Sequence, residues 1–300
     1  MRWDRRFVAT LAVLTGASMH AEGRAAQRPV ADVKFASPQH QIVVQVTLGK
    51  QGPFSMLLET GTDPSVIDVA LARRLRAISD AAPHAGEGVE PARANTWDMV
   101  DFGLGHMRAD TVAAVALDLG RLSDQLGMHV DGVLGYGFLR GRIVQIDYRR
   151  HRVRFYRDTP PWSGSESVEL EMTLDPGDPT PGFAGRINRR DVLLLYDSGS
   201  RSPLAVVGRS IVFLGLKAAF ETAAPDSAFG EGGRAETRKG RVPSVEIGQI
   251  RFTDVPCVFG VQGHGESWDR GTPAGTIGGA LLDGMVVTLD YPRRSIRFER

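Results

Sequence analysis

The chain of 300 residues has a single cysteine, Cys257, so no disulfide can form within it. Its stability must therefore come from a hydrophobic core, and 42% of its residues are hydrophobic. Cys257 lies in a short apolar stretch, residues 255–259 (VPCVF), which resembles a buried strand. We expect this cysteine to be a structural thiol.

An excess of charge of one sign is also missing. The sequence has 36 basic and 35 acidic residues, for a net charge of +1. Proteins that bind nucleic acid or anionic lipid through electrostatics carry a clear basic surplus. We therefore expect neither nucleic acid nor an anionic membrane surface among the partners.

No apolar run is long enough for a membrane span of about 20 residues. The clearest apolar segment, residues 7–15, follows three arginines and precedes several small residues. This order is typical of a secretory signal peptide, which we place at residues 1–21, with cleavage after Ser18 or Ala21. An uncleaved anchor is the alternative. We expect export to a periplasm or to the medium, with no stable membrane insertion after the signal is removed.

Motifs for metal, nucleotide or serine chemistry are absent as well. The seven histidines form no HExxH motif and no close cluster with the cysteine, so no metal site is expected. There is no G-x-S-x-G motif and no Walker loop. The glycines of residues 135–141 are out of register for a nucleotide loop. We therefore expect no cofactor.

What the sequence does have is one short pattern that occurs twice. Residues 54–62 read FSMLLETGT and residues 192–200 read VLLLYDSGS. In each, an apolar strand ends in a carboxylate, a hydroxyl residue, a glycine and a second hydroxyl residue. A carboxylate at the end of a buried strand needs hydrogen-bond donors, and the glycine allows a sharp turn that directs its N–H toward that carboxylate. One copy alone would describe an ordinary solvated turn.

The repetition extends beyond the two acidic loops. Residues 143–155 (IVQIDYRRHRVRF) align without a gap with residues 286–298 (VVTLDYPRRSIRF), at an offset of 143 residues. Residues 132–139 and 275–282 align at the same offset. These matches predict a tandem duplication.

LLETGT with VDGVLGYGFL, and LLYDSGS with AGTIGGALL, resemble the two halves of a bilobal aspartic protease, most closely the bacterial retropepsin-like group. The resemblance covers residues 40–300. It implies an all-β, two-lobed, pepsin/retropepsin-like barrel fold with short helices. We place the lobes at residues 30–157 and 168–300, on either side of a linker rich in Pro, Gly and Ser.

The resemblance also implies an active site. Glu59 and Asp197 would form the catalytic pair, within hydrogen-bonding reach or one water molecule of each other. Thr60 and Ser198 would tie the two loops together. The sequence departs from the family pattern at Glu59, where the family has aspartate.

Four further loop residues have implied roles. Gly61 and Gly199 would keep the two carboxyl groups coplanar through their N–H groups. Thr62 and Ser200 would form hydrogen bonds with the outer carboxyl oxygens.

The resemblance implies an aspartic endopeptidase that acts on a peptide or protein substrate, and we expect this protein to be exported and monomeric. The alternative is a pseudoprotease that binds extended peptides in the cleft between the lobes without cutting them. The reason is Glu59, because its extra methylene moves the carboxylate by roughly an ångström, and a shift of that size can cost on the order of a hundredfold in rate.

Local patterns predict the elements around the loops. Alternating apolar residues indicate a hairpin over residues 41–58. Helical spacing predicts a short helix within residues 64–78, with Asp68 as its N-cap, and a helix-like stretch over residues 206–219. Residues 79–94 and 229–240 have flap-like compositions.

Overall fold

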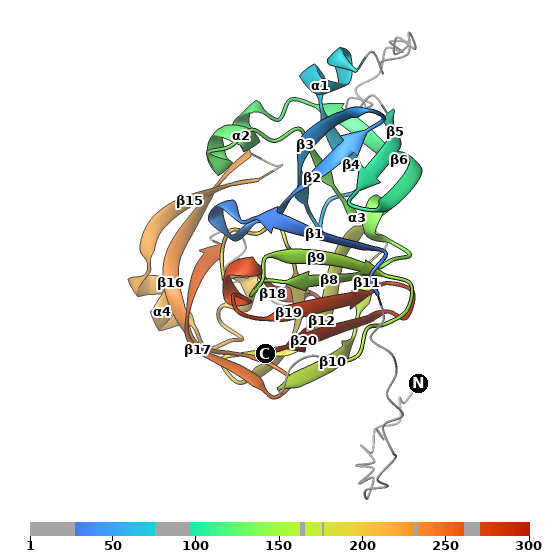
Figure 1. The fold of residues 1–300 in the computed structure, drawn as a ribbon. Coiled ribbons are helices and arrows are strands. Elements are labelled where there is room, and N and C mark those ends of the chain that lie inside the picture. Colours follow the sequence, from blue (N-terminus) through green and yellow to red (C-terminus); the bar gives the residue numbers. More distant parts are fainter. Residues whose placement is uncertain (1–27, 76–95, 163–165, 176, 231–232, 261–270) are drawn as a thin grey trace, which may run out of the picture.

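The structure is a computed structural model that describes residues 28–75, 96–162, 166–175, 177–230, 233–260 and 271–300. It is an all-β protein with two lobes, each built on a closed barrel, and a sheet to which both halves contribute strands (Figure 1). The predicted fold class is confirmed. No helix among the described residues is long and apolar enough to cross a membrane.

The first barrel has six strands, and its last strand, β5, pairs with its first, β2. In order around the barrel these strands are β2 (Val43–Leu48), β3 (Gln51–Leu58), β7 (Gly132–Leu134), β4 (Ser65–Asp68), β6 (Met107–Leu117) and β5 (Thr96–Leu104). The predicted hairpin corresponds to β2 and β3. The C-terminal end of β3 pairs in parallel with β7, so Leu58 lies beside Leu134 in the wall of the barrel.

The second barrel repeats this order and closes where β16 pairs with β12. Its strands are β12 (Asp178–Ile187), β13 (Arg190–Tyr196), β18 (Pro273–Ile277), β14 (Leu204–Val206), β17 (Ile250–Gly260) and β16 (Gly233–Ile247). Two further strands extend it, β11 (Thr173–Asp175) beside β12 and β15 (Ala224–Gly230) beside β16. The two barrels therefore share one topology, as the repeated sequence patterns led us to expect.

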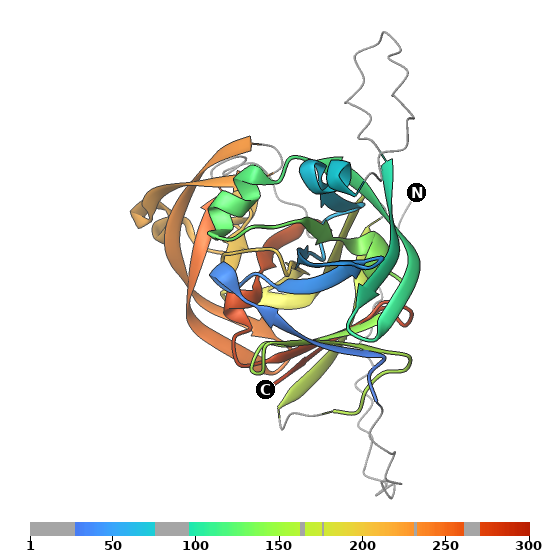
Figure 2. The same cartoon turned by 45° about the horizontal axis from the view of Figure 1, so that its top comes forward.

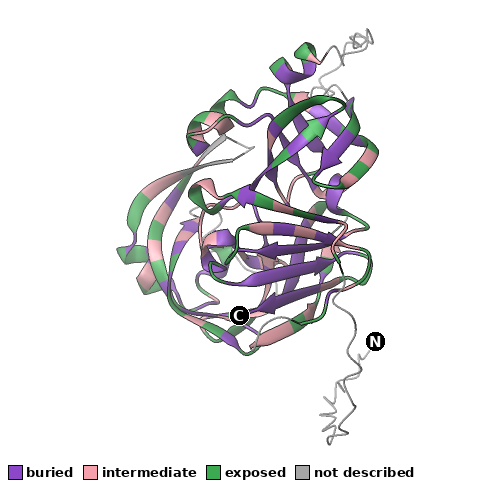
Figure 3. Cartoon of the chain, in the orientation of Figure 1, coloured by how far each residue is buried: buried purple, intermediate pink, exposed green. Residues whose placement is uncertain are grey.

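A six-stranded run of sheet joins the lobes. Its order is β10 (Ser167–Glu171), β20 (Ser295–Glu299), β19 (Val286–Asp290), β8 (Ile143–Asp147), β9 (Arg152–Tyr156) and β1 (Ala31–Ala36). The two halves meet at the antiparallel pair β8 and β19, where Gln145 lies opposite Thr288. Both strands are buried along their whole length (Figure 3). One cluster of apolar side chains runs from the first barrel into the second.

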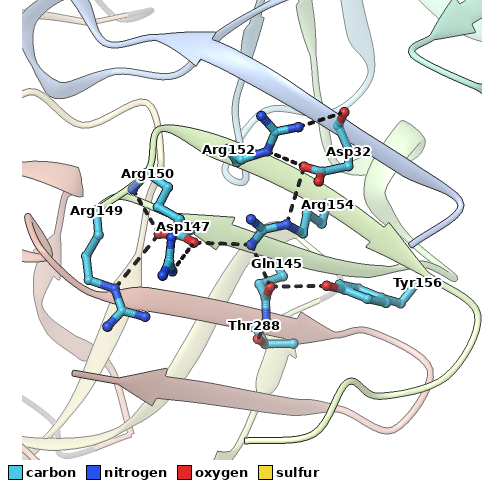
Figure 4. A network of polar contacts seen from close by, with 9 residues as sticks. All are labelled: Asp32, Gln145, Asp147, Arg149, Arg150, Arg152, Arg154, Tyr156 and Thr288. Atoms are coloured by element: carbon cyan, nitrogen blue, oxygen red, sulfur yellow. Dashed lines mark hydrogen bonds and ion pairs between the residues drawn. The ribbon is translucent and has the colours of Figure 1, made fainter. Parts of the chain in front are cut away.

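Polar side chains cover part of this sheet (Figure 4). Asp147 is only 1% exposed and forms ion pairs with Arg150 at 3.3 Å and Arg154 at 3.2 Å. Gln145 donates to Thr288 Oγ1 at 3.3 Å and so links the two halves. A buried carboxylate is tolerated when its oxygens meet such donors, so the network lets β8 carry polar residues inside the molecule.

The helices are short. They are η1 (Pro38–His40), α1 (Val69–Arg74), α2 (Gly120–Leu126), α3 (Tyr136–Leu139), η2 (Gly208–Ser210), α4 (Lys217–Thr222) and η3 (Gly279–Leu281). Asp68 caps α1 as predicted, because its Oδ1 accepts from Ala70 N–H at 2.8 Å and Leu71 N–H at 3.2 Å.

The first helix prediction is confirmed, because α1 lies within residues 64–78 and begins after Asp68, whereas the second is wrong in extent. Before α1, residues 65–68 form β4, which pairs with β6 and β7. Residues 204–206 form β14, which pairs with β17 and β18, and α4 begins only at Lys217. Both β4 and β14 fill a place between two strands that are distant in sequence, and that tertiary pairing outweighs the helical spacing.

The two flap-like segments have different outcomes. Residues 229–230 and 233–240, the described part of the second segment, lie in the hairpin formed by β15 and β16, in which Ala224 faces Lys239. Residues 79–94 lie outside the described residues. The linker prediction falls between the end of β9 at Tyr156 and the start of β10 at Ser167.

Cys257 is buried on β17, with 4% of its surface exposed, as predicted. Burial raises the pKa of its thiol to about 12. The thiol therefore stays protonated, and hence a poor nucleophile, at neutral pH.

Candidate active site

Glu59 and Asp197 stand at equivalent places in the two barrels. Glu59 directly follows β3 in the first barrel, and Asp197 directly follows β13 in the second. Glu59 N–H donates to the Leu134 carbonyl oxygen at 3.0 Å, and Asp197 N–H donates to the Ile277 carbonyl oxygen at 3.0 Å. These matching bonds fix the start of both acidic loops against a parallel neighbour strand.

The two carboxyl groups border the same small space beside Gly61. A Cβ atom placed on Gly61 would lie 3.8 Å from Asp197 Cγ and 3.8 Å from Glu59 Oε1. Asp197 Oδ1 accepts from Gly199 N–H at 2.8 Å, which is the contact expected of the glycine in the acidic loop. The Thr180 hydroxyl borders the same space, 2.9 Å from that Cβ position.

The side chain of Glu59 crosses to the second acidic loop. Its carboxylate lies so close to the Cα atom of Gly199 that a Cβ atom there would collide with both carboxylate oxygens. Glu59 is longer than aspartate by one methylene, and the room beside Gly199 accommodates the extra length. The pair is therefore built from two unequal side chains.

Thr60 and Ser198 connect the two loops through reciprocal hydrogen bonds. Thr60 Oγ1 accepts from Ser198 N–H at 3.1 Å and donates to the Tyr196 carbonyl oxygen at 3.0 Å. Ser198 Oγ accepts from Thr60 N–H at 3.1 Å and donates to the Leu58 carbonyl oxygen at 2.8 Å. Both side chains are fully buried, so these bonds are shielded from water.

Ser200 differs from its expected role. Its hydroxyl donates to the Ser202 carbonyl oxygen at 3.4 Å, because the turn after Ser200 brings that carbonyl close. Thr62 contributes its carbonyl oxygen, which accepts from Tyr136 N–H at 2.7 Å and so holds the first loop against α3.

Two glutamines and one arginine near the loops were not singled out from the sequence. Gln41 is buried and donates to the Gly199 carbonyl oxygen. Gln39 donates to the Gln125 carbonyl oxygen, and Arg201 donates to Gln39 Oε1 at 3.4 Å. Residues 39–41 of the first half thus lie against the second acidic loop. Nothing in the local sequence signals this contact, because it joins residues about 160 positions apart.

Two buried tyrosines, Tyr148 and Tyr196, lie beside the start of the second acidic loop. Tyr196 directly precedes Asp197, and its hydroxyl lies 2.7 Å from the Tyr148 hydroxyl. Burial raises the pKa of both phenols well above the ordinary value. Both therefore remain neutral over the pH range of ordinary enzymes and act as hydrogen-bonding supports.

The acidic pair opens into a cleft of about 760 Å³ between the lobes. Its wall from the first half includes α2, and its wall from the second half includes β16 and β17. The ribbon views of Figure 1 and Figure 2 show α2 beside the β15–β16 hairpin. The lining mixes apolar side chains with hydroxyl, amide and charged groups. The described residues contain no group of three or more histidine, cysteine or acidic side chains that could hold a metal ion.

Part of the sequence matches a known protein family. The family model for aspartyl proteases matches residues 44–138. The matched segment contains the first acidic loop and most of the first barrel, so this part of the chain is aspartyl-protease-like. No curated protein sequence matches the chain.

Solved structures extend the likeness to both lobes. Basic 7S globulin from soybean and conglutin gamma, a basic 7S globulin from lupine seeds, each give a TM-score of 0.52 at 10% identity, covering 91% of this chain and 95% of theirs. These likenesses establish a shared two-lobed fold. A retropepsin-like aspartic protease from Rickettsia conorii gives a TM-score of 0.32 at 16% identity, covering 47% of this chain and 96% of its own.

Proposed function

We propose that the protein is an aspartic-type endopeptidase that hydrolyses peptide bonds with Glu59 and Asp197. The observation that carries the proposal is that both carboxyl groups, at equivalent strand ends, border one space in the cleft between the lobes. The aspartyl protease match over residues 44–138 supports it.

The proposed reaction needs only a water molecule and the two carboxyl groups. The ionised carboxylate removes a proton from the water, whose oxygen adds to the peptide carbonyl carbon, while the protonated carboxyl group donates its proton to the carbonyl oxygen. The tetrahedral intermediate then breaks its C–N bond: the protonated carboxyl group donates its proton to the departing amine, and the ionised one takes a proton from a hydroxyl group of the intermediate, which restores the pair. Products are a new carboxyl terminus and a new amino terminus.

A pseudoprotease that binds peptides in the same cleft is the second candidate. The position of the Glu59 carboxylate against Gly199 favours it, because this is a different place from that of a shorter aspartate. A misplacement of about 1 Å can lower a rate on the order of a hundredfold.

A peptide-library digest separates the two candidates. Wild type, Glu59→Asp and Asp197→Asn are incubated with the library from acid to neutral pH, and products are identified by mass spectrometry. The endopeptidase proposal expects cleavage by the wild type and none by Asp197→Asn. If the wild type is inert and Glu59→Asp cleaves, the pseudoprotease is correct.

Binding of a statine-type peptide provides the second readout, because the hydroxyl of that mimic replaces the water held by the acidic pair. Both candidates expect binding to the wild type. If none of the three folded variants cleaves any peptide or binds the mimic, both proposals fail.

We further propose that the protein is exported as a monomer after removal of residues 1–21. The support is the sequence pattern at the N-terminus, which lies outside the described residues. Mass spectrometry of the exported protein should find a start after Ser18 or Ala21, and light scattering should give the mass of one chain. An intact Met1 or Arg2 would contradict the signal peptide.

A further inference from the structure

The charged groups of the cleft are unevenly distributed. Apart from the acidic pair, the charged residues that line it are Asp118, Arg121 and Arg201. Asp118 accepts from Gly120 N–H at 2.8 Å, beside the start of α2. Arg201 belongs to the second acidic loop, four positions after Asp197.

Arg201 is held in place by a neutral group. Its guanidinium donates to the Gln39 amide oxygen at 3.4 Å, and no carboxylate of the described residues lies within ion-pair distance of it. Gln39 is itself anchored, since its amide nitrogen donates to the Gln125 carbonyl oxygen at the end of α2. Arg201 is half-buried, and its guanidinium contacts a neutral amide and forms no ion pair with a carboxylate of the described residues.

The first acidic loop has no cation at the equivalent position. After its second hydroxyl residue, Thr62, comes Asp63, whose carboxylate is exposed and accepts from Gly137 N–H at 3.0 Å. The position that carries a positive charge beside Asp197 therefore carries a negative one beside Glu59. Of these two residues only Arg201 lines the cleft.

We propose that Arg201 binds a carboxylate of the substrate and so makes the protein selective for peptides that are acidic on the Arg201 side of the scissile bond. A guanidinium pairs with a carboxylate through two parallel N–H···O bonds, and partial burial strengthens that pair. The carboxylate belongs either to an acidic side chain or to the C-terminus of the peptide. This inference rests on the proposed function, because it assumes that peptides occupy the cleft.

The test measures binding, so it does not depend on turnover. Statine-type peptides are prepared with glutamate or glutamine at each position flanking the statine, each with a free or an amidated C-terminus. Dissociation constants are measured by calorimetry for wild type, Arg201→Gln, Arg201→Lys and Arg209→Gln. Arg209 is the matched control, because it is exposed on η2 and does not line the cleft.

At one flanking position the wild type should bind the glutamate peptide about tenfold to a hundredfold more tightly than the glutamine peptide, the value of a charge-assisted hydrogen bond. If the carboxylate is the C-terminal one, the free and amidated peptides should show this ratio instead. Arg201→Gln should reduce the ratio to about one, Arg201→Lys should keep part of it, and Arg209→Gln should keep all of it.

The outcomes distinguish a failure of the Arg201 role from a failure of the proposed peptidase function. If the mimics bind the wild type with no dependence on a carboxylate, or if Arg201→Gln retains the full ratio, the role of Arg201 is wrong while the proposed function stands. If no mimic binds whatever its charge, the proposed function fails and the role of Arg201 fails with it.

Discussion

Gly199 lets Glu59 reach the second acidic loop because it has no side chain. A Cβ atom at this position would collide with the Glu59 carboxylate. Gly199 does not have a positive φ, so the backbone itself would tolerate an alanine. The requirement for glycine here comes from the neighbouring carboxylate.

We therefore expect Gly199→Ala to lower peptide cleavage on the order of a hundredfold, because it displaces the Glu59 carboxylate by about an ångström. The melting temperature should change little, since the displaced group is the end of a flexible side chain. Steady-state kinetics and thermal unfolding measure the two effects.

The control is the same substitution in the Glu59→Asp background. Aspartate is too short to occupy the space beside Gly199, so Gly199→Ala should cost less there than in the wild type, as expected for two coupled residues. Equal losses of activity in the two backgrounds would mean that Glu59 and Gly199 do not interact.

At the scale of elements, the acidic loops act as one unit. Thr60 and Ser198 exchange hydrogen bonds and also bind the carbonyl oxygens of Tyr196 and Leu58. Each hydroxyl therefore spans from its own loop to the strand of the other half.

Ser198→Ala should destabilise the protein, because it leaves the Leu58 carbonyl oxygen and the Thr60 N–H buried without a partner. Each such group costs about 1–3 kcal/mol. Thr60→Val should have a comparable effect, and the double variant should lose less than the sum of the two. Urea unfolding of the four proteins measures this; strictly additive losses would show that the two hydroxyls act independently.

The sequence was most informative where it repeats. The hairpin that delivers Glu59, the strand that delivers Asp197 and the cap at Asp68 were predicted because each has a local pattern. The strands β4 and β14 were not, since each lies between strands that are distant in sequence. The contacts of Gln39 and Gln41 with the second loop could not be predicted either, because they depend on how the two halves pack.

At the scale of the whole molecule, three tyrosines are buried where the lobes meet the central sheet. Burial raises the pKa of Tyr148, Tyr196 and Tyr291. Tyr148 and Tyr196 share a hydrogen bond, whereas the Tyr291 hydroxyl has no hydrogen-bond partner among the described residues.

These shifts predict a loss of stability at alkaline pH. In the unfolded chain a tyrosine loses its proton near pH 10, while the folded protein retains it to higher pH. Above pH 10 the folded state therefore binds more protons, and the free energy of unfolding falls as pH rises, by about 1.4 kcal/mol per pH unit for each buried tyrosine. Cys257 adds a similar dependence between pH 9 and about 12.

Tyr291→Phe tests this assignment without breaking a hydrogen bond. Urea unfolding at several pH values above 10 should show a shallower fall in stability than in the wild type. Below pH 9 the variant should have the same pH dependence as the wild type. An unchanged slope above pH 10 would show that Tyr291 ionises normally in the folded protein.

The two acidic side chains differ in length, and this difference shows how such a site can change during evolution. In a symmetric dimer of one-lobed chains, a single codon specifies both carboxylates, so any replacement appears on both sides at once. Here Glu59 and Asp197 are encoded separately, and a longer side chain can be introduced on one side while its partner and Gly199 stay as they were. Joining two barrels in one chain thus lets each half of the site be inherited and altered on its own.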